Sequence, residues 1–359
     1  MDAIIYFSGM HYSHIQNYFA LHDALNEPGI DTHIIVPNSK WGFSSLDFIE
    51  DYEISIKHRD KVHFLNNSDA INFLRSNRHK VALLGSNFRK GNIESRDISA
   101  SKDAGAYVIQ VATIPVDFYS GPADEAFAIS PYFYDVMAGD SGLPGLKITY
   151  GNCILWDDVT HNIKIKSREF LCQKYDLDPD QPILIWAPDA VQCQHENARK
   201  IYERITGLPN VLIKLHPNEW RRHKADRIGG RWSFEVYGTK DKPVKVLQES
   251  DAASALRNAD YVIGYQSSIG IETSFWKTPT IYVEENDPSN LLFNESAKKF
   301  WNHKYCWAGW SIDVNEIEDF IKSRPVLPDQ DYQDHNSKIL YDASRNSIDI
   351  LVERVRELV

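Results

Sequence analysis

Three short segments in the second half of the chain combine an apolar run with polar side chains that can do chemistry. They read ILIWAPD at 183–189, IKLHPNE at 213–219 and GYQSSIGIE at 264–272. In each segment the apolar run predicts a buried strand, and polar residues follow where that strand ends. These polar side chains are of the kinds that hold anions and move protons. We therefore treat the three segments together as the candidate site.

The second segment ends its predicted strand with His216 and Pro217. Pro217 biases His216 toward an extended backbone, which stops the strand from passing directly into a helix. An imidazole can donate a hydrogen bond to a phosphate or a carboxylate, and its charge can change near neutral pH. The residues alone leave a second interpretation equally open, in which His216 only completes a turn.

The third segment places Gln266, Ser267 and Ser268 between a predicted strand and a predicted helix. The free N–H groups at a helix start favour an anion, and serine hydroxyls add donors. Simple N-capping by serine is the alternative. However, Glu272 lies four residues after Ser268, one residue further than a capping box requires. We therefore predict a phosphate at the two serines and a ribose diol at Glu272.

The first segment ends in Pro188 and Asp189. A carboxylate at a strand end can contact a reacting sugar, act as a base or act as a nucleophile. It is equally suited to cap the helix that follows. Both interpretations of Asp189 stay open.

Strands that alternate with helices must position these residues. Apolar runs predict strands at 3–7, 32–36, 80–84, 106–111, 125–129, 182–186, 211–215, 261–263 and 280–283, with helical patterns between most of them. Such alternation is typical of α/β proteins with parallel sheets, in which ligands bind beyond the carboxyl ends of the strands. We expect two Rossmann-like domains that face a central cleft. A turn-rich break at 139–151 separates residues 1–150 from 151–335, and closing helices follow at 336–359.

Composition and charge exclude several classes of protein. The 359 residues carry a formal net charge of −11, which gives no overall attraction to nucleic acid. No apolar run approaches the roughly 20 residues of a membrane span. The first residues have no features of a signal peptide, so we expect a cytoplasmic protein. A basic run at 221–224 is typical of a solvated surface. Its alternative role is to meet phosphates or lipid head groups, which would place the protein peripherally at the inner face of the membrane.

We expect no metal and no cofactor. The cysteines have no zinc-like spacing, and no pair of carboxylates at a strand end demands a metal. Asp157 and Asp158 lie near the expected linker. We expect this acidic pair to form a solvated turn; the alternative is that the two carboxylates bind a metal ion.

Taken in order, the three segments resemble the donor half of GT-B-fold transferases. The likeness covers about residues 180–285 and is strongest to bacterial surface-polysaccharide enzymes. These include the capsule sialyl- and Kdo-transferases, with their HP and SS motifs, and the CDP-glycerol glycerophosphotransferases. The resemblance implies that His216, with Pro217 beside it, and the Gln266–Ser268 stretch contact the donor phosphate, and that Glu272 holds the ribose. Residues 277–279 (KTP) match a GKP turn of such enzymes, with Lys277 and Thr278 where that turn has Gly and Lys.

The resemblance also implies a reaction. We expect a glycosyltransferase that moves a sugar from a nucleotide-activated donor, with a cytidine nucleotide favoured, to a glycan or glycolipid acceptor. His216 would stabilise the leaving phosphate. Asp189 or His11, which follows the first predicted strand, would be the base; a purely structural role for His11 is the alternative.

Three other functions fit the same fold. One is a CDP-glycerol-type glycerophosphotransferase. Another is a hydrolysing UDP-GlcNAc 2-epimerase, although such epimerases carry a glycine-rich loop where this chain has Gln266, Ser267 and Ser268. The third is a non-catalytic subunit that binds nucleotide sugars.

Overall fold

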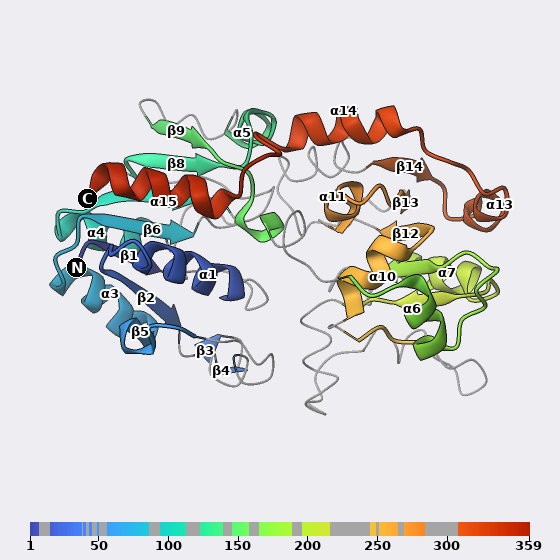
Figure 1. Ribbon diagram of the computed structural model, residues 1–359, viewed down its shortest axis with the longest axis horizontal. Coiled ribbons are helices and arrows are strands. Elements are labelled where there is room, and N and C mark those ends of the chain that lie inside the picture. Colours follow the sequence, from blue (N-terminus) through green and yellow to red (C-terminus); the bar gives the residue numbers. More distant parts are fainter. Residues whose placement is uncertain are drawn as a thin grey trace. The chain divides into compact units, whose positions relative to one another are not determined.

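The chain is described as two compact units. The computed structural model describes residues 1–6, 15–37, 39–40, 43–44, 49, 56–85, 94–112, 123–138, 146–157, 165–188, 196–215, 245–248, 251–264, 269–283 and 308–359. The first unit comprises Met1–His161 and Lys338–Val359, and the second comprises Asn162–Ser337. Figure 1 shows both units as sheets flanked by helices. The domain limits expected at 150 and 335 stay predictions.

The described part of the first unit contains a seven-stranded sheet, and every strand pair in it is parallel. In spatial order the strands are β5 (Val62–Leu65), β2 (Thr32–Pro37), β1 (Ala3–Tyr6), β6 (Val81–Gly85), β7 (Tyr107–Val111), β8 (Glu125–Ala128) and β9 (Lys147–Tyr150). A separate antiparallel pair joins β3 (Ser39–Lys40) to β4 (Phe43–Ser44). The central strands are short runs of fully buried apolar residues, as a sheet covered on both faces requires.

Helices cover both faces of this first sheet. On one face α1 (Ile15–Asn26) and α15 (Ser347–Leu358) pack on side chains such as Ile5 and Leu83. On the other face α3 (Asn67–Ser76) and α4 (Glu94–Asp103) pack on Ile4 and Leu84. The remaining elements are η2 (Arg59–Lys61), α5 (Pro131–Ala138) and η3 (Ile154–Trp156).

The described part of the second unit contains a five-stranded parallel sheet. In spatial order its strands are β11 (Val211–Ile213), β10 (Leu184–Ala187), β12 (Tyr261–Gly264), β13 (Thr280–Val283) and β14 (Gly309–Ile312). On one face lie α7 (Glu196–Ile205) and α13 (Ile317–Lys322). On the other face lie α6 (Arg168–Tyr175), α10 (Ala252–Asn258) and the start of α11 (Ile269–Ser274). Each unit is therefore a doubly wound α/β layer structure, which confirms the expected fold class.

The C-terminal part of the chain returns to the first unit. Helix α14 (Asp329–Ile339) contains the division at Ser337 and Lys338, and α15 then packs against α1. The Asn152 side chain fastens the connection between the two helices: its Oδ1 accepts from the amides of Tyr341 (2.7 Å) and Asp342 (3.1 Å). Asn152 adopts φ 62°, a left-handed conformation that asparagine tolerates better than most residues. The expected closing helices are thus present, and α15 belongs to the core of the first unit.

Besides the short β3–β4 pair, three strands of the two parallel sheets were not expected from the sequence: β5, β9 and β14. All three lie at sheet edges, and most of their residues are only partly buried. Strand β9 lies inside the break predicted as turn-rich, so that stretch also carries an edge strand.

Candidate functional site

The strongest candidate site lies at the carboxyl edge of the second sheet, where the direction of the connections reverses. The chain leaves β10 through α7 and reaches β11 on one side. It leaves β12 through α11 and reaches β13 on the other side. The two connections therefore diverge beyond the ends of β10 and β12, and open α/β sheets bind ligands at such a point.

The strand register brings the three sequence segments together. Ala187, the last residue of β10, pairs with Gly264, the last residue of β12. On the opposite side of β10, Trp186 pairs with Ile213, the last residue of β11. All three segments therefore leave adjacent parallel strands at the same edge of the sheet. This adjacency could not be read from the sequence, because spacing along the chain does not give strand order.

Most of the predicted site residues follow directly after these strand ends. They lie outside the described residues, as does the basic run at 221–224: the residues concerned are Asp189, His216, Pro217, Gln266, Ser267 and Ser268. Their roles stay predictions.

Glu272 is the predicted site residue that the structure describes. It lies in the first turn of α11 and is partly exposed, while the residues beside it in the helix are buried. A carboxylate in a first turn is stabilised by the positive end of the helix dipole. Helix α11 begins at Ile269, so Ser268 directly precedes it, as the capping interpretation and the phosphate-binding interpretation both require.

Polar contacts that the sequence did not predict hold the buried side of α11. The Thr273 hydroxyl lies 3.1 Å from the Thr280 hydroxyl of β13. The Ser274 hydroxyl donates to Oδ1 of Asn336 in α14 at 2.8 Å. Thr273, Ser274 and Thr280 are all buried. No pattern in the sequence links Ser274 to a residue 62 positions away.

The turn after α11 explains the comparison with the GKP motif. The amide of Thr278 donates to the Thr273 carbonyl at 3.0 Å, and the amide of Lys277 donates to the Ser274 carbonyl at 3.2 Å. This pair of bonds is a Schellman motif, in which the residue after the C-cap takes a left-handed conformation. Lys277 holds that position with φ 58°. A glycine would occupy it without strain, so the departure from the motif falls on a backbone that favours glycine.

The first sheet has the same kind of reversal. The connection after β1 leads through α1 to β2, and the connection after β6 leads through α4 to β7 on the opposite side. Tyr6 at the end of β1 pairs with Leu84. The candidate base His11 comes after β1 in the sequence and lies outside the described residues, so its role stays a prediction.

The expected solvated turn at Asp157 is wrong. This carboxylate is buried and accepts hydrogen bonds from the amides of Ser347 (2.8 Å) and Ile348 (2.9 Å). It therefore satisfies free N–H groups at the start of α15. Asp158 lies outside the described residues. In the part of the chain that the structure describes, no group of three or more His, Cys, Asp or Glu side chains could hold a metal ion.

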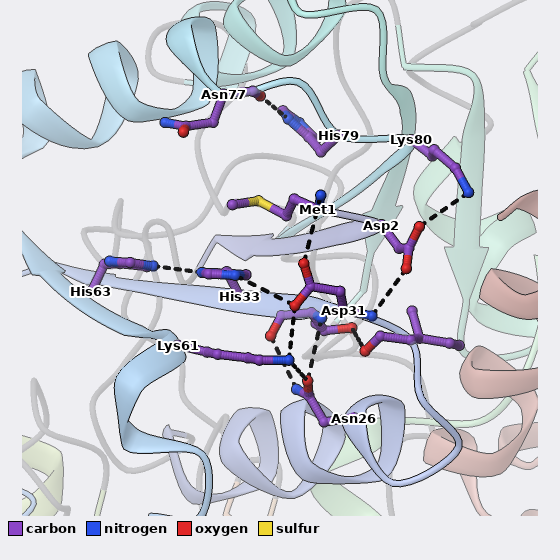
Figure 2. Close-up of polar contacts among 12 residues, drawn as sticks. Met1, Asp2, Asn26, Asp31, His33, Lys61, His63, Asn77, His79 and Lys80 are labelled. Carbon is purple, nitrogen blue, oxygen red and sulfur yellow. Dashed lines mark hydrogen bonds and ion pairs between the residues drawn. The ribbon is translucent and has the colours of Figure 1, made fainter.

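A second polar cluster lies at the opposite, amino edge of the first sheet (Figure 2). Asp31, just before β2, accepts from Lys61 at 2.8 Å, and Asp2 pairs with Lys80 at 3.0 Å. Nδ1 of His33 lies 2.8 Å from Nε2 of His63 on the neighbouring strand. Burial lowers the pKa of His33 and of His63. Because ligands of open α/β sheets bind at the other edge, we assign this cluster to holding strand starts together. The contacts of Asp31 and His33 join β2 to β5, and the Asp2–Lys80 pair joins β1 to β6.

Comparison with known proteins identifies the fold of this chain. No family model matches the chain, and no curated protein sequence matches it. Solved structures do match. The S. aureus MnaA–UDP structure is 13% identical, with a TM-score of 0.63 over 100% of this chain and 98% of that one. UDP-GlcNAc 2-epimerase from Methanocaldococcus jannaschii is 15% identical, with a TM-score of 0.61 over 99% of both chains. A glycosyltransferase from Rickettsia africae is 12% identical, with a TM-score of 0.57 over 99% of this chain and 98% of that one.

These likenesses show that the chain has the α/β fold of the GT-B class, built from two Rossmann-like units. They extend along essentially the whole chain, beyond the segment of about residues 180–285 on which the sequence resemblance rests. No described helix is long and apolar enough to cross a membrane.

Proposed function

We propose that the chain is a glycosyltransferase that takes its sugar from a nucleotide-activated donor bound at the carboxyl edge of the second sheet. The observation that carries the proposal is the register of β11, β10 and β12. Three segments with anion-binding and proton-transfer side chains leave adjacent strands beside the point where the connections reverse. The structurally similar MnaA was solved with UDP, and an epimerase from Neisseria meningitidis was solved with UDP-GlcNAc.

The proposed reaction exchanges one bond at the sugar for another. The bond between the anomeric carbon and the donor phosphate oxygen breaks, and the acceptor hydroxyl oxygen bonds to that carbon. Negative charge builds up on the leaving phosphate, where His216 and the Ser267 and Ser268 donors stabilise it. Asp189 or His11 takes the proton from the acceptor hydroxyl. We propose a glycan or glycolipid of surface-polysaccharide synthesis as the acceptor.

The base of the nucleotide is the first question to test. The motifs resemble those of cytidine-nucleotide enzymes, whereas three of the similar solved structures contain UDP or UDP-GlcNAc. Wild-type protein should be heated with CMP, CDP, UMP, UDP or GDP. A ligand at about 100 times its Kd stabilises the folded state by about 2.7 kcal/mol and so raises the Tm.

Glu272→Ala should lose most of this shift, because Glu272 is proposed to hold the ribose. Glu169→Ala is the matched control, since Glu169 is an exposed acid in the first turn of α6 in the same unit. It should keep the full shift. If no nucleotide raises the Tm of wild-type protein, the proposed donor site is wrong.

A hydrolysing UDP-GlcNAc 2-epimerase is the second candidate, because solved epimerases match the chain over nearly its full length. The two reactions differ in what they require. A transferase needs an acceptor hydroxyl to release its nucleotide, whereas the epimerase releases UDP from UDP-GlcNAc alone and inverts carbon 2 of the sugar. Incubation with UDP-GlcNAc in deuterated water, followed by NMR, separates them: acceptor-free release of UDP with an inverted carbon 2 would favour the epimerase.

A further inference from the structure

Helix α11 is too short to hold its own orientation. It spans Ile269–Ser274, and isolated helices of this length are unstable in water because each turn must first be nucleated. Its place is therefore set by contacts with other elements. The direction in which Glu272 points depends on those contacts, and not on the helix itself.

Asn336 of α14 makes the most specific of these contacts. Its Oδ1 accepts from the Ser274 hydroxyl at 2.8 Å, and its Nδ2 donates to the Ser274 carbonyl at 3.4 Å. Ser274 is fully buried, and its hydroxyl also lies 2.6 Å from the Ile271 carbonyl. Asn336 thus binds both the side chain and the backbone of one residue at the end of α11.

The contact between Asn336 and Ser274 lies on the face of α11 opposite to Glu272. Successive residues of an α-helix are about 100° apart, so Ser274 is about 200° from Glu272. The exposures agree, because Ser274 is fully buried while Glu272 is partly exposed. The contact between the Thr273 and Thr280 hydroxyls holds a second face of α11, about 100° around the helix axis from Glu272. Two such contacts fix the rotation of α11 about its axis.

We propose that Asn336 is a positioning residue of the nucleotide site: by holding Ser274 it fixes the rotation of α11, and it thereby aims Glu272 at the ribose of the bound nucleotide. This inference rests on the proposed function, which gives Glu272 that contact. Asn336 acts through Ser274 and α11, and does not itself touch the nucleotide.

The test compares two nucleotides that differ only in the hydroxyls Glu272 would hold. Isothermal titration calorimetry measures the Kd of UDP or CDP, whichever binds wild-type protein, and of its 2′,3′-dideoxy analogue. Hydrogen bonds to a carboxylate should make the ribonucleotide bind about tenfold or more tightly. Asn336→Ala should weaken ribonucleotide binding about fivefold to tenfold and leave the Kd of the dideoxy analogue unchanged, as Glu272→Ala should. Asn336→Asp keeps the Oδ1 acceptor and should restore most of the preference.

Two controls separate positioning from a general loosening of the fold. In a Ser274→Ala background, Asn336→Ala should cost much less than in wild-type protein, because only the 3.4 Å bond from Nδ2 to the Ser274 carbonyl is left to lose. Gln333→Ala, on an exposed position of the same helix, should leave both Kd values unchanged.

The outcomes separate failure of this inference from failure of the proposed function. If Asn336→Ala weakens the binding of both nucleotides equally, or weakens the binding of neither, the positioning role is wrong while the proposed nucleotide binding stands. The role is also wrong if the two losses add in the double variant. If wild-type protein binds no nucleotide, or Glu272→Ala leaves the preference for ribose intact, the proposed site is wrong, and the role of Asn336 falls with it.

Discussion

Arg354 of α15 holds the buried carboxylate of Glu125 with two donors: Nη2 lies 2.7 Å from Oε2, and Nε lies 3.0 Å from both oxygens. Tyr107 and Thr149 donate to the same carboxylate at 2.9 and 2.6 Å. Burial alone would raise the pKa of Glu125, but these hydrogen bonds, first of all those from Arg354, bring it below its ordinary value. The last helix of the chain is thus tied to strand β8 by a charged pair inside the first unit.

Removing one partner of this pair should be strongly destabilising. Arg354→Met removes the hydrogen-bonded cation of the buried Glu125 carboxylate and leaves only the longer contact to the exposed Lys147 at 3.6 Å, and such a loss costs about 3–5 kcal/mol. Urea denaturation measures the free energy of unfolding. Arg356→Met is the matched control, because Arg356 is exposed on the same helix and should change stability by no more than about 0.5 kcal/mol. The double variant Glu125→Leu/Arg354→Met should be more stable than Arg354→Met. Equal effects of the two single arginine changes would contradict this account.

Asp157 should act as a helix cap. Asp157→Ala removes the acceptor for two amides at the start of α15 and should cost about 1–2 kcal/mol. Asp157→Asn keeps one oxygen and should cost less. Thermal unfolding with and without Mg²⁺ tests the rival role: a Tm that Mg²⁺ raises in wild-type protein but not in Asp157→Ala would show that the carboxylate binds metal.

Lys277→Gly should stabilise the second unit. The left-handed conformation costs a residue with a side chain about 1 kcal/mol, and the extra freedom of glycine in the unfolded chain offsets part of the gain. We expect a net gain of about 0.5 kcal/mol by chemical denaturation. The exposed ion pair of Lys277 with Asp329 (2.9 Å) contributes little. Lys277→Ala loses the same pair without relieving the strain, so it should give no gain; a loss of stability in Lys277→Gly would refute the strain argument.

Acid should destabilise the first unit through His22 of α1. Burial, followed by the nearby charge of His58, lowers the pKa of His22 from 6.5 to about 4. The unfolded chain therefore binds a proton in a pH range where folded His22 does not. The stability from this residue is complete above about pH 6.5, falls by about 3 kcal/mol as the pH decreases to about 4, and then levels off.

Hydrogen exchange of the α1 amides between pH 7 and pH 4.5 would measure this effect, after correction for the intrinsic exchange rate. His22→Gln should flatten the pH dependence of the opening free energy. His33→Gln should flatten it less, because His33 is about 20% exposed. An unchanged slope in His22→Gln would show that other groups cause the acid sensitivity.

The sequence predicted the central strands well and the edges poorly. Runs such as that of β1 are wholly apolar because both faces of the strand are buried, and that pattern is legible. Strand β5 (VHFL) has only four residues, and His63 interrupts its apolar run, so no continuous apolar stretch marks it in the sequence. The alternation of strands and helices along the chain indicated the fold class. The strand order had to come from the structure, because spacing along the chain does not give it.

The candidate site could also be predicted only in part. Strand ends could be predicted, and Glu272 does lie in the first turn of a helix after β12. The contact of Asn336 with Ser274 could not be predicted, because it depends on how α14 packs and leaves no spacing in the chain. The prediction for Asp157 was wrong because an acidic pair is typical of a solvated turn, whereas the partners of this carboxylate lie 190 and 191 residues away.

The return of α15 to the first unit affects the order in which the protein can fold during synthesis. The second unit is one continuous stretch, Asn162–Ser337, so it can complete its sheet while later residues are still inside the ribosome. The first unit begins earlier but lacks the side chains of Ile350, Leu351 and Val355, which form part of its core. Until α15 emerges, the apolar face that it covers stays open to chaperones and to other nascent chains. The unit made first is therefore the last to be finished.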